Sequence, residues 1–169
     1  MKNKMSEQDA DSTATVTYRT SWGDGWIRFD SAGLVEMGLP GQASSGSPPV
    51  ELPQPVASLI TELENYWNGG PLPVVDPVIR GRAATTPLMR SIYDVVCSIP
   101  AGSTRTYAEV AAAAGRPGAA RSVGSAMAGN PFAPMIPCHR VVGSDGSLRG
   151  YGGGLDMKES LLDMERAGA

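Results

Sequence analysis

The only histidine of the chain, His139, directly follows Cys138, one of its two cysteines. A thiol reacts as the thiolate, and imidazole is the side chain that most often takes its proton. Pro137 precedes the pair, and the glycines and prolines on both sides predict an irregular loop, where catalytic groups are often found. Because an adjacent cysteine and histidine can also arise by chance, the surrounding elements must decide whether the pair carries chemistry.

The composition is that of a globular protein without a disulfide framework or a metal site. Of the 169 residues, 41% are hydrophobic and 18% are charged, which is ordinary for one domain or two small ones. Two cysteines and one histidine are too few for a zinc site, and we expect no metal and no cofactor. Cys97 is predicted to be a buried structural thiol within a helix. A reducing interior suits both thiols.

Charge is distributed unevenly along the chain. The net charge of −3 argues against a protein that coats nucleic acid by electrostatics alone. Residues 1–80 carry 5 basic and 10 acidic side chains, whereas residues 81–169 carry 9 and 7, so a polyanion would bind the second half. No apolar run reaches the roughly 20 residues of a membrane helix, and the first residues lack the apolar core of a secretion signal. These features predict a cytoplasmic protein with no membrane partner.

The first half of the chain predicts a small α/β domain over residues 14–72. Residues 1–13 are polar and aperiodic, and we expect a flexible tail there. Alternating apolar residues and tight turns from residue 15 to 37 predict two or three short antiparallel strands, and residues 38–55 predict a loop. Apolar spacing over residues 56–67 predicts an amphipathic helix. Since it shows no evident chemistry, this domain is interpreted as a scaffold.

The second half predicts a mainly α-helical domain over residues 86–169, joined to the first by an extended connector, residues 73–85. A threonine followed by proline begins its first helix. Thr106 and Glu109 fit a capping box that begins the second. A glycine-containing turn leads to a third helix over residues 119–128, which completes a helix-turn-helix.

The helix over residues 119–128 has an unusual outer face. One side is apolar, and the other presents small residues and one arginine: Arg121, Gly124, Ser125 and Ala128. A major-groove reader would project several long polar side chains toward base edges, and this face has none. Small residues suit either a close approach to a nucleic-acid backbone or narrow groove, with Arg121 as a probe, or close packing by another helix. Helical spacing alone leaves both alternatives open.

Glu165 ends a last predicted helix over residues 155–165 and shares a face with Leu161 and Leu162. A carboxylate that points inward near a helix C-terminus is disfavoured by burial and by the helix dipole, so it needs a partner. His139 would supply one. A solvated terminal glutamate is the alternative.

Several motifs of the second half, in their order and spacing, closely resemble those of the O6-alkylguanine-DNA alkyltransferases. They are Arg121-Ser122-Val123-Gly124, Gly129-Asn130-Pro131, Pro137-Cys138-His139-Arg140-Val141-Val142 and Gly150-Tyr151-Gly152-Gly153-Gly154-Leu155, followed by Lys158, Leu161-Leu162 and Glu165. The resemblance covers nearly all of residues 82–166, and the first half matches more loosely. It implies a small α/β N-terminal domain, an antiparallel sheet plus a helix, and a mainly α C-terminal domain that contains the helix-turn-helix and carries the reaction.

The resemblance implies catalytic roles for five residues. Cys138 would accept an alkyl group, His139 would activate it through a water molecule, and Glu165 would orient His139. Asn130 would brace the loop around the site, and Tyr107 would help to turn the target phosphate.

The resemblance also implies how the site meets the damaged base and DNA. Tyr151 would line the guanine pocket, where backbone groups at Cys138, Val141 and Gly152 would read the base edge. The helix over residues 119–128 would enter the minor groove, and its arginine would fill the gap left by an everted base. The DNA-facing residues would be Arg121, Ser122, Gly124, Ser125 and Ala128.

The implied function is direct reversal of DNA damage. An alkyl group would pass irreversibly from O6 of guanine in duplex DNA to Cys138, once per protein molecule, after base flipping. The expected partner is double-stranded DNA containing O6-alkylguanine, bound by a monomer. Activity on O4-alkylthymine, preference among alkyl groups and cooperative assembly on DNA are left open.

The sequence departs from the family pattern at several positions. Arg149 stands where the family more often has a small or uncharged residue, and would contact a phosphate or narrow the pocket rim. Gly152 lacks the small side chain often found there, and the zinc ligands and second acceptor cysteine of some members are missing.

Two rival functions are the alternatives to this one. A non-catalytic lesion sensor would lack the acceptor Cys138. A Cys-His hydrolase would need an oxyanion hole and would leave the helix-turn-helix without a purpose.

Overall fold

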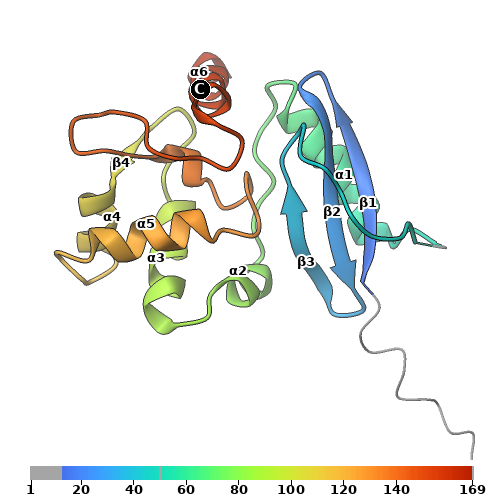
Figure 1. Ribbon diagram of the computed structural model, residues 1–169, viewed down its shortest axis with the longest axis horizontal. Coiled ribbons are helices and arrows are strands. Elements are labelled where there is room, and N and C mark those ends of the chain that lie inside the picture. Colours follow the sequence, from blue (N-terminus) through green and yellow to red (C-terminus); the bar gives the residue numbers. More distant parts are fainter. Residues whose placement is uncertain (1–12, 50, 169) are drawn as a thin grey trace, which may run out of the picture.

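A computed structural model describes residues 13–49 and 51–168 of the chain. The N-terminal half forms a sheet with one covering helix, and the C-terminal half forms a cluster of helices beside it (Figure 1). Apart from Thr13, the predicted tail lies outside the described residues. None of the helices in the described part is long and apolar enough to cross a membrane.

Three antiparallel strands, in the order β1-β2-β3, confirm the predicted short antiparallel strands. They span Ala14–Thr20, Gly23–Asp30 and Gly33–Gly38. Tyr18 of β1 pairs with Gly25 of β2, and its ring lies so close that a Cβ at Gly25 would overlap it. The buried Tyr18 hydroxyl donates to the Gly38 carbonyl at 2.9 Å. This bond fixes the end of β3, from which the chain runs toward the site.

Helix α1, Gln54–Tyr66, packs against the sheet. It begins two residues before the predicted start because proline is well tolerated in the first turn, where backbone N–H groups have no helical partner. At its C-terminal end Leu63, Tyr66 and Trp67 are at most 1% exposed. The last turn of α1 is therefore buried between the two halves of the molecule.

The connector is not extended throughout, as the sequence had predicted, but contains helix α2, Pro77–Ala83. Asp76 begins this helix because its carboxylate accepts a hydrogen bond from the Val78 N–H at 2.6 Å, and proline fits the first helical position. Within α2, Arg82 donates two hydrogen bonds to the Asp30 carboxylate, at 2.7 and 3.2 Å. The connector is thus fastened to the β2–β3 turn.

As far as it is described, the C-terminal half contains four α-helices after the connector and one short pair of strands. The helices are α3 (Pro87–Cys97), α4 (Tyr107–Ala113), α5 (Ala120–Ala128) and α6 (Leu155–Gly168). The strands β4 (Arg105–Thr106) and β5 (Val141–Val142) pair in parallel. A 3₁₀ turn, η1, spans Cys138–Arg140.

Helices α4 and α5 pack against each other as the predicted helix-turn-helix, with α3 beneath them (Figure 1). Tyr93 of α3 is fully buried and donates to the Ala126 carbonyl of α5 at 3.0 Å. Cys97, predicted to be buried, is only half-buried, because it lies at the last residue of α3 beside Arg80. One hydrophobic core runs from the sheet through α1 to α3, α5 and Cys138.

Thr106 forms the predicted capping box. Its hydroxyl accepts from the Glu109 N–H, and the Glu109 carboxylate accepts from the Thr106 N–H at 2.7 Å. We expect Thr106→Ala to lower the free energy of unfolding by about 1 kcal/mol, since the first turn of α4 loses its cap. Urea unfolding measures this loss. Thr61→Ala, which removes an exposed hydroxyl from the interior of α1, is the control, and an equal loss in both variants would contradict the capping role.

Candidate active site

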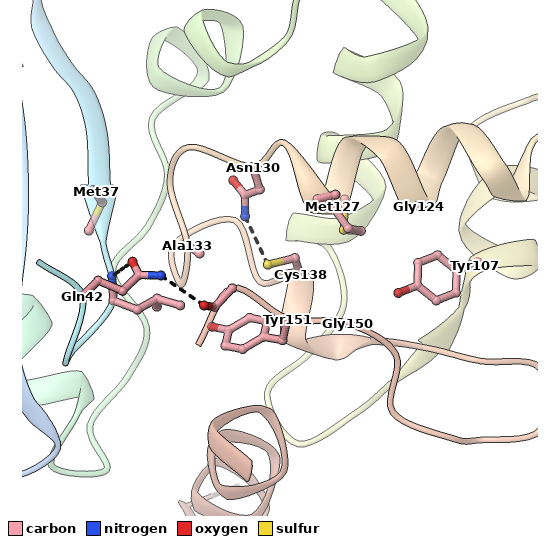
Figure 2. A pocket seen from close by; sticks show the side chains of 13 residues that line it. Met37, Gln42, Tyr107, Gly124, Met127, Asn130, Ala133, Cys138, Gly150 and Tyr151 are labelled. Carbon is pink, nitrogen blue, oxygen red and sulfur yellow. Dashed lines mark hydrogen bonds between the residues drawn. The ribbon is translucent and has the colours of Figure 1, made fainter. Parts of the chain in front are cut away.

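A cavity of about 390 Å³ lies between the sheet and the helical half, with Cys138 in its wall (Figure 2). Segments from β3 and its following loop, α4, α5, the loop before Cys138 and the glycine-rich run all contribute. The lining residues are Met37, Leu39, Gln42, Tyr107, Gly124, Met127, Ala128, Asn130, Ala133, Cys138, Gly150, Tyr151 and Gly152. A cavity of this volume is in the range that holds a small organic ligand.

Cys138 begins the 3₁₀ turn η1 and is 6% exposed. The Asn130 amide donates to its Sγ at 3.3 Å and to the Ile136 carbonyl at 2.8 Å, while its own oxygen accepts from the Phe132 N–H at 3.0 Å. Asn130 thus ties three points of one loop together around the thiol (Figure 2). Burial raises the pKa of Cys138, and the Asn130 hydrogen bond opposes that rise without cancelling it. The resting group is a thiol that needs a base.

His139 is fully buried behind Cys138, and its Nε2 lies 2.9 Å from Glu165 Oε1. Burial lowers the pKa of His139, against the opposing effect of the Glu165 carboxylate. A neutral imidazole beside a carboxylate carries its proton on the nitrogen that faces the carboxylate, so we assign it to Nε2. Nδ1 then remains as the acceptor, and within the described part of the chain it has no hydrogen-bond partner.

Glu165 points inward from α6 with its side chain 3% exposed, so it is not the solvated terminal glutamate of the alternative reading. Arg140 binds both carboxylate oxygens, from Nε at 2.9 Å and from Nη2 at 2.7 Å. Burial pushes the pKa of Glu165 upward, but the hydrogen bonds from His139 and Arg140 outweigh it and hold that pKa well below its usual range. Arg140 is itself anchored to the Ile99 carbonyl at 2.6 Å. The carboxylate is therefore an ion at neutral pH.

Two site residues were missed by the sequence analysis, and a third, Arg140, was named in a motif but given no role. Tyr66 of α1 donates from its hydroxyl to Glu165 Oε1 at 2.9 Å, and Gln42 donates to the Gly152 carbonyl at 3.1 Å. Both come from the domain interpreted as scaffold. Arg140, the third, adjoins His139 in sequence, and this adjacency was the one signal that could have pointed to it. For Tyr66, an aromatic residue at the end of an amphipathic helix gives no sign beyond that of a core residue.

Helix α5 presents its small residues to the cavity and to solvent. Gly124 and Ala128 line the cavity, whereas Arg121, Ser122 and Ser125 are exposed. A Cβ at Gly124 would meet no atom within 4 Å, so among the described residues nothing packs tightly there. The alternative that this face receives another helix is not supported by the described part of the chain.

Two tyrosines reach the cavity from different elements. Tyr107, the first residue of α4, is half-buried in its wall, and burial raises the pKa of that phenol. The Tyr151 ring lies edge-on to the His139 ring, with centroids 6.3 Å apart. Burial raises the pKa of Tyr151 well above its usual value. Its hydroxyl has no partner within the described residues and remains a free donor.

Val141 is not brought to the cavity. It is fully buried in β5, which pairs with β4, and its carbonyl accepts a hydrogen bond from Lys158 Nζ at 2.7 Å. Lys158 also donates to the Arg149 carbonyl at 3.0 Å. The Arg149 guanidinium is exposed and pairs with Asp145 at 3.4 Å, on the same loop.

The described residues contain no cluster of three His, Cys, Asp or Glu side chains that could hold a metal ion. The cavity is lined by a buried thiol and two phenols, and a neutral imidazole held by a carboxylate lies directly behind the thiol. Such a set can activate a nucleophile and protonate a leaving group without any added group.

Comparison with known proteins gives a consistent result. The family model of the 6-O-methylguanine DNA methyltransferase DNA-binding domain matches residues 87–167. A methylated-DNA–protein-cysteine methyltransferase of Methanothermobacter thermautotrophicus is 40% identical over 144 residues, which are 85% of this chain and 76% of that protein. The enzyme of the same name from Methanosarcina barkeri is 54% identical over 80 residues, 47% of this chain, and the match spans about half, 51%, of that protein.

Solved structures are similar over nearly the whole chain. The Mycobacterium tuberculosis O6-methylguanine methyltransferase superposes with a TM-score of 0.74 at 30% identity, covering 93% of this chain and 94% of that one. A complex of M. tuberculosis OGT with DNA gives the same TM-score and identity, with 94% and 95% covered. The predicted fold class, an α/β N-terminal part and a helical C-terminal part, is confirmed.

Proposed function

The chain belongs to the methylated-DNA–protein-cysteine methyltransferase family, and on that premise we propose that it repairs DNA by moving an alkyl group from O6 of guanine to Cys138. One observation carries the proposal to this chain: the buried Cys138 thiol opens onto a base-sized cavity while His139 and Glu165 stand directly behind it. A site of this kind places a nucleophile and its general base at a cavity that a flipped-out nucleobase could enter.

The reaction exchanges one bond for another. The thiol proton passes to Nδ1 of His139, by way of a water molecule because adjacent side chains seldom face one another. The sulfur lone pair then forms the S–C bond as the C–O6 bond breaks, and the electron pair of that bond remains on the guanine. The guanine takes up a proton from Tyr151, and the proton held by His139 then passes through water to the Tyr151 phenolate, so atoms and charge balance. The thioether left on Cys138 is not readily hydrolysed, which makes the protein single-turnover.

Release of guanine needs a proton donor, and Tyr151 is placed to be one. Its hydroxyl is buried in the cavity wall with no partner among the described residues, and its raised pKa keeps it protonated at neutral pH. A phenol held without a protein acceptor can donate to the base as negative charge develops on it. The Gly152 peptide, held by Gln42, borders the same space and is proposed to read the base edge with the Cys138 backbone.

Double-stranded DNA is the proposed partner, approached through α5. The O6 atom lies within the duplex stack, so a thiolate reaches its alkyl group only after base flipping. Gly124 and Ala128 join the helix surface to the cavity, and the small residues allow α5 to come close to a narrow minor groove. The exposed Arg121, Ser122 and Ser125 are proposed to contact DNA, and Tyr107 to contact the phosphate of the flipped nucleotide.

Arg121→Ala should separate DNA handling from chemistry. We expect the transfer rate from duplex DNA to fall at least about tenfold, because no side chain fills the gap left by the flipped base, while reaction with free O6-benzylguanine stays within about twofold. Both rates are measured on the same preparations. Arg19→Ala, at an exposed position on β1, controls for the loss of one positive charge. Equal losses on duplex and free base would refute the flipping role.

A labelled-methyl assay tests the proposed function and separates it from its rivals. Duplex DNA carrying O6-methylguanine with a radiolabelled methyl group is supplied in excess over the protein. Protein-bound label should rise to one methyl group per chain and stop. A lesion sensor would bind the duplex without acquiring label, and a hydrolase would release label to the solvent over many turnovers.

A further inference from the structure

Tyr66, a residue of the N-terminal half, contacts the histidine that acts as the general base and the glutamate that orients it. Its hydroxyl donates to Glu165 Oε1 at 2.9 Å and lies 3.4 Å from Nε2 of His139. The residue is 1% exposed and comes from the last turn of α1, 99 positions before Glu165 in sequence. A tyrosine that served only to fill the core would not need to place its hydroxyl on the carboxylate that holds the histidine.

The Glu165 carboxylate is saturated with donors. Oε1 accepts from Tyr66, His139 and Arg140, and Oε2 accepts from Arg140 and from the Gly102 N–H at 3.2 Å. Each donor spreads the negative charge of the carboxylate and weakens its pull on the other donors. The Nε2 proton of His139 is therefore bound to Glu165 by a weaker hydrogen bond than a carboxylate with no other donors would give.

We propose that Tyr66 is a positioning residue that tunes the proton affinity of His139 through Glu165, and that the N-terminal half thereby takes part in the chemistry. This inference rests on the proposed function, in which His139 must be neutral to accept the thiol proton. By sharing Oε1, the hydroxyl limits the stabilisation that Glu165 gives to the imidazolium. The imidazole then stays neutral until Cys138 gives up its proton.

The groups that face His139 come from four parts of the fold. Their charges together with the Tyr66 hydroxyl determine the proton affinity of His139. They are Tyr66 from α1, Cys138 and Arg140 from η1, Tyr151 from the glycine-rich run, and Lys158 and Glu165 from α6. Tyr66 is the member of this set that the N-terminal half supplies.

Tyr66 and Glu165 also line a second cavity, of about 270 Å³, which shares no lining residue with the first. Cys138 borders the first cavity, and the fully buried His139 lies between it and Glu165. The chain of polar groups therefore connects the face that would meet DNA with a separate opening behind it. Tyr66→Phe keeps the ring that walls this opening and removes only the hydroxyl.

The single histidine makes a direct test possible. In tag-free, full-length protein labelled with ¹⁵N in the imidazole, every histidine signal in an NMR pH titration belongs to His139. Tyr66→Phe should raise its proton affinity about three- to tenfold, an upward shift of about half to one pH unit. The pH below which the transfer rate falls should rise by the same amount.

Tyr18→Phe is the matched control, because it also removes a buried hydroxyl bond from the N-terminal half but leaves Glu165 alone. An unchanged titration in Tyr66→Phe, or an equal shift in Tyr18→Phe, would overturn the proposal. In the wild-type protein, a nuclear Overhauser effect between the His139 Nε2 proton and the Tyr66 hydroxyl proton is expected, and its absence would overturn it even if the variant fails to fold. None of these NMR readouts requires alkyl transfer, so failure here is distinguishable from failure of the proposed function.

Discussion

Replacing Cys138 by alanine is expected to abolish alkyl transfer while leaving DNA binding in place. The sulfur is the atom to which the carbon must bond, and no other thiol lines the cavity of the described structure. Arg121 and the small face of α5 are untouched, so the variant should still bind a duplex that carries O6-methylguanine. Chromatography of the digested DNA measures the remaining O6-methylguanine, and a gel-shift assay measures binding.

Cys97→Ala provides the control, since Cys97 is half-buried at the end of α3 and does not line the cavity. That variant should transfer one methyl group per chain, like the wild type. Transfer by Cys138→Ala at any rate above the background in DNA alone would show that the acceptor has been misassigned.

Glu165→Gln should have the largest effect on stability. The change leaves the buried Arg140 guanidinium facing a neutral amide, and breaking a buried ion pair on one side costs about 3–5 kcal/mol. The Nε2 proton of His139 also loses its anionic acceptor, so transfer should slow by about 10²-fold or more. Urea unfolding and single-turnover transfer rates measure the two effects.

Asp163→Asn is the matched control on the same helix, because Asp163 is exposed and pairs with the exposed Arg166. Its effect should stay below about 1 kcal/mol. Similar losses in the two variants would contradict the buried network at Glu165.

The same carboxylate predicts a dependence of stability on pH. The pKa of Glu165 is lower in the folded protein than in the unfolded chain, so its stabilising contribution is present above the unfolded value, near about 4.3. That contribution is lost as the pH falls below this value toward the folded pKa. Wild-type stability should therefore fall more steeply than that of Glu165→Gln between about pH 5 and pH 3, as measured by urea unfolding at each pH.

Local signals in the sequence predicted most elements of the fold. The capping box at Thr106, the alternation over β1 to β3 and the spacing of Leu161, Leu162 and Glu165 each depend on residues close together in the chain. The exceptions are α2, which the prolines of the connector led us to read as extended, and the short parallel strands β4 and β5, which the sequence did not predict. Asp76 followed by Pro77 is a favourable helix start, but the high proline content of the connector favoured an extended prediction.

The site was only partly predictable because its remaining contacts join distant segments. Tyr66 meets Glu165 across 99 positions, and Gln42 meets Gly152 across 110. No spacing rule relates such residues, and both lie in a domain whose own pattern explains them as core or loop. Val141, a motif position carried over from the resemblance, is not among the residues that line the cavity, and its carbonyl accepts a hydrogen bond from Lys158.

The acceptor cysteine itself can be identified by one measurement. Wild-type protein is incubated with duplex DNA that contains O6-methylguanine, digested, and analysed by peptide mass spectrometry. One added methyl group should appear on the peptide that contains Cys138 and none on the peptide that contains Cys97, the other cysteine of the chain. Methylation elsewhere, or a fully repaired duplex with both cysteines unmodified, would contradict transfer to Cys138.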